Sequence, residues 1–152
     1  MKNQTRINRL QKLADFLLEL PADRFDYSAW VEEDDGECGT VCCAIGWMPK
    51  VDPKKWKWKK DDGYFSHIIL PTLKGKDEDE YSPAHYSMEY FGIDGELHGF
   101  LFEASNDGDI IFELDMESDD YIDFHVPPTV VAKRILKVID GLKAGKLKEY
   151  LD

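Results

Sequence analysis

The feature that most limits how this chain can fold is an apolar segment from Glu37 to Pro49, which holds all three cysteines. From Thr40 to Met48 its side chains are apolar or small, so this part has no polar face that water could solvate, and we expect it to be buried. Thr40 is a good N-cap, and the apolar residues after it recur at helical spacing. We therefore predict a short buried central helix over Thr40–Met48, which Pro49 ends.

Amphipathic helices are predicted at both ends of the chain. Apolar residues recur every three or four positions from Ile7 to Leu20, with polar residues such as Arg6 between them, and Pro21 stops the pattern. Near the C-terminus, Pro127-Pro128 opens a second helix with an apolar stripe from Val131 to Leu142. The residues predicted on its exposed side are Lys133, Arg134, Lys137 and Lys143.

Two short helices are predicted in the second half of the chain. Ser82 can cap a helix that starts at Pro83, and Gly92 marks its end. Asp94 can cap the next helix, whose buried residues would be Leu97, Phe100 and Leu101.

A lysine- and tryptophan-rich stretch, Lys54–Lys60, predicts a strand with Trp56 and Trp58 on one face. Asp61-Asp62-Gly63 would form the turn, and Tyr64–Leu70 would return as the second strand. Basic residues interleaved with aromatic ones can also bind single-stranded nucleic acid. Protection of an edge strand by lysines is the interpretation we favour in so acidic a chain.

The segment from Glu103 to Asp123, here called the acidic segment, has nine carboxylates and no basic residue. Phe112, Leu114 and Met116 alternate with acids, which predicts a half-buried hairpin with an acidic outer face. Its turn would lie at Ser118-Asp119-Asp120, with a second arm over Tyr121–Val126.

Length and composition favour an α+β protein with a single compact domain over residues 1–152. In this fold, amphipathic helices at both termini surround the short buried helix, with one or two small antiparallel hairpins. A net charge of −12 disfavours direct binding to nucleic acid or an anionic membrane and favours basic partners. Because no stretch approaches eighteen consecutive apolar residues, we expect no membrane span and a cytoplasmic protein.

Several motifs in order carry a family resemblance. They are Phe25-Asp26-Tyr27-Ser28-Ala29-Trp30, then Cys38-Gly39-Thr40-Val41-Cys42-Cys43-Ala44-Ile45-Gly46-Trp47, and later Tyr90-Phe91-Gly92-Ile93 and Leu101-Phe102. The chain resembles a family of small bacteriophage and bacterial proteins with a Cys-Gly-Thr-x-x-Cys-x-x-Gly-Trp core. This resemblance implies a phage or mobile-element setting in a host cytoplasm, and it brings no activity with it. It does not extend to the acidic segment or to Lys54–Lys60.

Cys38 is the one candidate catalytic residue. A cysteine just before a helix N-terminus can be a nucleophile, because the helix dipole and free N–H groups favour the thiolate. Its base would be one of four histidines: His67, His85, His98 or His125. A thiol-dependent hydrolase is therefore the alternative function, while reduced cysteines buried for packing are the interpretation we favour.

Two possible metal sites are not adopted. Cys38 and Cys42 with a histidine could hold zinc, but the second ligand pair usual in structural zinc sites is missing. Residues 103–110 resemble the start of a calcium loop, but Leu114 stands where the bidentate glutamate would be. We predict no metal and no cofactor.

The predicted function is a non-catalytic binding module, an inhibitor or regulator whose acidic surface engages a basic surface on a protein partner. One form of this function would imitate the phosphate array of a nucleic acid. The predicted partner-binding residues, here called the acidic face, are Asp107, Asp109, Glu113, Asp115, Glu117, Asp119, Asp120 and Asp123.

Overall fold

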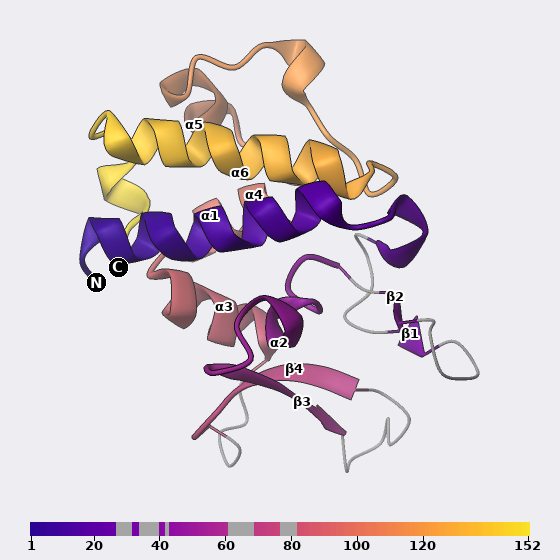
Figure 1. The fold of residues 1–152 in the computed structure, drawn as a ribbon. Coiled ribbons are helices and arrows are strands. Elements are labelled where there is room, and N and C mark those ends of the chain that lie inside the picture. The colour runs from indigo at the N-terminus through magenta and orange to yellow at the C-terminus, as the bar shows by residue number, and fades with distance from the viewer. Residues whose placement is uncertain (27–31, 34–39, 42, 61–68, 77–81) are drawn as a thin grey trace.

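Two long helices, α1 (Asn3–Glu19) and α6 (Pro128–Lys143), lie side by side at the centre of the molecule (Figure 1). The computed structural model describes residues 1–26, 32–33, 40–41, 43–60, 69–76 and 82–152. The Asn3 side chain donates to the Leu142 carbonyl at 3.2 Å, so the start of α1 meets the end of α6 and the two helices run antiparallel. Both predicted terminal helices are confirmed.

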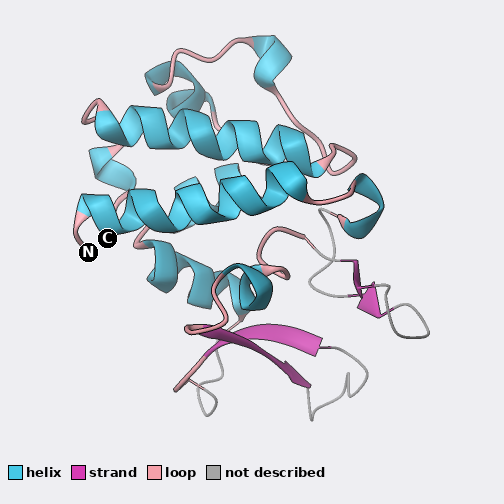
Figure 2. Ribbon diagram, in the orientation of Figure 1, coloured by secondary structure: helices cyan, strands magenta, loops and turns pink. Residues whose placement is uncertain are grey.

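Shorter elements cover this helix pair on two sides (Figures 1 and 2). Beyond α1 lie α2 (Met48–Val51), α3 (Pro83–Phe91) and a hairpin of β3 (Trp56–Lys60) and β4 (Ile69–Leu73). Beyond α6 lies α5 (Gly108–Glu113), while α4 (Gly95–Phe102) packs behind the pair. The remaining elements are β1 (Glu32–Glu33), β2 (Thr40–Val41) and the 3-10 turns η1 (Ala22–Arg24), η2 (Ser118–Asp120) and η3 (Lys148–Tyr150). The predicted α+β class and single compact domain are confirmed.

Local capping explains why α3 and α4 form where the sequence predicts them. The Ser82 hydroxyl accepts from the His85 N–H at 3.4 Å, and the Asp94 carboxylate accepts from the Leu97 N–H at 2.9 Å. Gly92 ends α3 in the left-handed conformation, with φ of 65°. An added Cβ there would lie 3.0 Å from an Arg6 guanidinium nitrogen, so this position also needs glycine for space.

The predicted central helix over Thr40–Met48 is wrong, although the segment is buried as predicted from Cys43 to Pro49. Thr40–Val41 form β2, residues 44–47 form turns, and the helix is α2, which begins at Met48. Pro49 lies in the first turn of α2, where a missing N–H costs nothing. Proline therefore starts this helix, whereas the sequence analysis used it to end one.

The predicted acidic hairpin is also wrong. Residues 108–113 form α5 and residues 118–120 form η2, and no strand occurs among the described residues of the acidic segment. The Asp107 carboxylate accepts from the N–H groups of Asp109 and Ile110, both at 3.0 Å, and thereby caps the helix. Helical spacing of the buried residues then outweighs the alternation at Phe112, Leu114 and Met116.

The Lys54–Lys60 stretch forms a strand from Trp56 to Lys60, where β3 pairs antiparallel with β4. Of the predicted return strand over Tyr64–Leu70, residues 64–68 lie outside the described residues, and β4 covers Ile69–Leu73, which includes its last two residues. The predicted turn at Asp61–Gly63 lies outside the described residues. Trp56 is buried, and the Trp58 indole N–H donates to the Gly46 carbonyl at 2.9 Å, which ties the hairpin to the buried segment.

Two arginines that the sequence analysis placed on polar helix sides are buried. Arg6 donates from α1 to the carbonyls of Phe91, Gly92 and Asp152, so it joins the first helix to the end of α3 and to the C-terminus. Arg134, predicted on the exposed side of α6, likewise joins α6 to the acidic segment through hydrogen bonds to backbone carbonyls. A buried arginine is tolerated where most of its donors find acceptors, as the two terminal guanidinium nitrogens of each residue do here.

No helix in the described part of the chain combines the length and the apolar character that crossing a membrane requires.

Candidate functional site: an acidic and aromatic face

The acidic segment is held on α6 by an apolar contact. Ile110, Ile111 and Leu114 are buried at helical spacing on the inner side of α5. Gly141 of α6 permits a close approach, because an added Cβ at that position would lie 2.4 Å from a Leu114 methyl group. The outer side of α5 is therefore fixed toward solvent.

Hydrogen bonds from Arg134 of α6 fix the rest of the acidic segment. Its guanidinium donates to the carbonyls of Phe100, Ser105 and Asp120 and to the Asn106 side-chain oxygen, at 2.7 to 3.0 Å. The Asn106 side chain also bonds both backbone groups of Ile122, each at 3.0 Å. One buried cation thus joins two parts of the acidic segment, residues 105–106 and Asp120, to each other and to α4.

The eight carboxylates of the acidic face are not equivalent, as the sequence analysis had assumed. Several are engaged within the chain. Their partners are the helix N–H groups for Asp107, the Leu147 N–H for Glu113, the Lys146 ammonium for Asp115, the Glu117 N–H for Asp120 and the His125 N–H for Asp123. The Lys146 hydrogen bond and charge lower the pKa of Asp115 below its usual value. The Glu117 carboxylate accepts from the Asp120 backbone N–H in the capping box of η2, so the exposed carboxylates left to face a partner are Asp109 and Asp119.

Three exposed aromatic side chains lie in or directly after the acidic segment, and none of them was predicted to be exposed. Phe112 is 85% exposed, and Tyr121 and Phe124 are each about half exposed. Among the described residues, every exposed aromatic side chain belongs to this part of the chain. The signal that could have identified Phe112 is the cap at Asp107. It predicts a helix over the following residues, and on that helix Phe112 lies on the side opposite the buried residues.

The cysteines give the enzyme alternative little chemistry in the described structure. Cys38 and Cys42 lie outside the described residues, so the hypothesis of a thiol-dependent hydrolase with Cys38 as nucleophile stays a prediction. Cys43 is described, buried and free, and its burial raises its thiol pKa to about 11. A thiol in that state is a packing group at neutral pH, because the thiolate is the nucleophile.

We expect the Cys43 thiol to react slowly with an aromatic disulfide reagent at neutral pH in the native protein. Burial blocks access, and the raised pKa keeps the thiolate fraction small. The experiment titrates a variant with Cys38→Ser and Cys42→Ser, native and in denaturant, so that Cys43 is the one thiol counted. Full reaction of the native variant within seconds would contradict the packing role.

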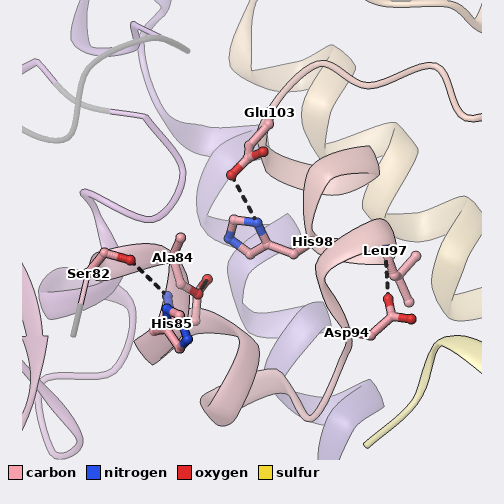
Figure 3. A network of polar contacts seen from close by, with 8 residues as sticks. Ser82, Ala84, His85, Asp94, Leu97, His98 and Glu103 are labelled. Atoms are coloured by element: carbon pink, nitrogen blue, oxygen red, sulfur yellow. Dashed lines mark hydrogen bonds and ion pairs between the residues drawn. The ribbon is translucent and has the colours of Figure 1, made fainter.

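A buried histidine on α4 lies beside a carboxylate (Figure 3). The Nδ1 atom of His98 is 3.3 Å from a Glu103 carboxylate oxygen, and its Nε2 is buried without a hydrogen-bond partner in the described structure. Burial lowers the pKa of His98, and Glu103 opposes that shift. Of the other candidate bases, His85 and His125 are exposed, and His67 lies outside the described residues. No hydrogen bond joins His98 to the described cysteine.

Metal binding and known relatives add no further site. Within the described residues, no group of three or more histidine, cysteine, aspartate or glutamate side chains is placed to hold a metal ion. In the stretch that resembles a calcium loop, Asp107 accepts backbone N–H groups as the cap of α5. Comparison of the chain with protein-family models, curated proteins and solved structures finds no match.

Proposed function

We propose that the protein is a non-catalytic binding module whose acidic face engages a basic surface on a protein partner. The observation that carries this proposal is that the exposed aromatic residues Phe112, Tyr121 and Phe124 all fall within residues 112–124, in or directly after the acidic segment. Large aromatic side chains are costly to leave in water and are enriched at the centres of protein interfaces. Solvation alone explains acidic residues, but it does not explain exposed aromatic rings among them.

The negative charge of the acidic segment indicates that the proposed partner is positively charged. The acidic segment contains no basic residue, and the chain as a whole carries a net charge of −12. An ordered negative surface attracts a basic partner over a distance and rejects acidic ones. Aromatic rings beside the carboxylates add cation–π contacts with lysine or arginine side chains. One form of this role is imitation of a nucleic-acid backbone in a phage or mobile-element setting, with an inhibitor or regulator as the result.

The first test reverses two exposed carboxylates of the acidic face, Glu117→Lys and Asp119→Lys. Immobilised wild-type protein should capture a basic protein from bacterial lysate, and the double variant should capture roughly tenfold less, because repulsion replaces attraction. Capture should also fall at about 1 M salt, where the screening length is about 3 Å.

The matched control is Glu19→Lys with Asp23→Lys, two exposed acids at the far end of α1 and in η1. It changes the net charge by the same amount but leaves the acidic face intact. Equal capture by the wild type and by both double variants would show that the acidic face does not select the partner. Circular dichroism checks that each variant keeps its helices.

A further inference from the structure

An open cleft of about 900 Å³ lies where the start of α4, the outer side of α5 and η3 meet. No described residue that lines this cleft carries a positive charge. Its carboxylates come from three separate elements and converge on one hollow: Asp94, Glu96, Asp109, Glu113 and Glu149. The cleft therefore extends the acidic face around the outer side of α5.

A tyrosine on the wall of the cleft has an unused polar group. Tyr150 is only 5% exposed, and within the described structure its hydroxyl has no hydrogen-bond partner. Burial, followed by the charges of Glu149 and other nearby acids, raises its pKa to about 12. The hydroxyl thus stays protonated at neutral pH and offers an acceptor lone pair as well as a donor to a group that enters the cleft.

Phe112 supplies an aromatic surface at the same place. Its ring lines the cleft and is the most exposed large apolar side chain among the described residues. A guanidinium group stacks well on such a ring, and the chain already uses this contact internally. The guanidinium carbon of Arg9 lies 4.3 Å from the centre of the Tyr90 ring, and that of Arg134 lies 4.1 Å from the Phe100 ring.

We propose that this cleft is the socket for an arginine side chain of the basic partner, an inference that rests on the proposed function. A planar guanidinium can stack on Phe112 while its several N–H donors reach carboxylates on different walls and the Tyr150 oxygen. An ammonium group has three donors on one atom and cannot span acceptors on opposite walls in this way. A metal ion fits less well, because no described group of carboxylates is placed to coordinate one.

The test measures binding of a tetra-arginine peptide and a tetra-lysine peptide to the whole protein by titration calorimetry. We expect the arginine peptide to bind roughly tenfold more tightly, since the two peptides carry the same charge and differ in the geometry of their donors. Phe112→Ser and Tyr150→Phe should each weaken the arginine peptide several-fold and change the lysine peptide little. Leu18→Ser, which removes an exposed apolar side chain from α1, is the matched control and should change neither.

Equal binding of the two peptides, or indifference of the arginine peptide to Phe112→Ser, would overturn the arginine socket. Displacement of the arginine peptide by spermidine at equal charge concentration would also overturn it, because the cleft would then be a general site for cations. The proposed function has its own readout, which is capture of the partner by the Glu117→Lys and Asp119→Lys variant. If Phe112→Ser captures the partner as well as the wild type does, while the double variant does not capture it, the arginine socket is rejected and the proposed binding module is retained.

Discussion

Replacing Arg134 by methionine is expected to lower the free energy of unfolding by about 3 to 5 kcal/mol, because the carbonyls it serves remain buried without donors. The side chain is 2% exposed and donates four hydrogen bonds to residues of three other stretches. Methionine restores the volume of the side chain but none of these donors. In a domain whose total stability is roughly 5 to 15 kcal/mol, this is a large share.

Thermal and urea unfolding of the Arg134→Met variant measure this loss, and Lys133→Met, the exposed neighbour on the same helix, is its control. A drop in melting temperature of roughly 10 °C is expected for Arg134→Met and almost none for Lys133→Met. Matching melting curves for the two variants would show that Arg134 does not anchor the acidic segment.

Ile45→Asp is expected to unfold the protein. Ile45 is fully buried within the segment from Cys43 to Pro49, so the new carboxylate would lie in the core without a partner. Burying an unpaired polar group costs several kcal/mol, and the lost apolar contacts add to that cost. The far-ultraviolet circular dichroism spectrum of the purified variant should lose its helical signal.

Ile45→Val is the matched control, because it keeps the site apolar and removes one methylene group. Its expected cost is about 1 kcal/mol, so it should fold and melt a few degrees earlier than the wild type. A folded Ile45→Asp variant with a wild-type melting curve would contradict the burial of this segment.

The parts of the fold that sequence predicts are those that local interactions decide. The ends of α3 and α4 follow from Ser82, Gly92 and Asp94, whose caps involve neighbours only three to four residues away. The apolar stripes of α1 and α6 are long enough for their helical period to be unambiguous.

The errors arise where local signals conflict or where burial comes from distant residues. In the acidic segment, alternation at Phe112, Leu114 and Met116 competes with helical spacing at Ile110, Ile111 and Leu114, and the cap at Asp107 decides in favour of the helix. Apolar composition predicts that Cys43–Pro49 is buried, but it does not distinguish a helix from successive turns.

The candidate site divides in the same way. Its charge can be read from the sequence, because a run of acids without bases stays acidic in any fold. Which carboxylates are engaged depends on tertiary partners such as Lys146 for Asp115 and the Leu147 N–H for Glu113. Burial of Arg134 likewise requires carbonyls from other elements, so a pattern of apolar stripes places it wrongly on the exposed side.

The most direct test of the central claim is the location of the bound partner. We would record amide chemical shifts of labelled protein while adding the basic protein that the capture experiment identifies. The account predicts that the largest shift changes fall within residues 107–123, on α5 and η2, and that they disappear at about 1 M salt. Shift changes concentrated on α1 or on the hairpin of β3 and β4, with residues 107–123 unchanged, would contradict the assignment of the acidic face as the binding surface.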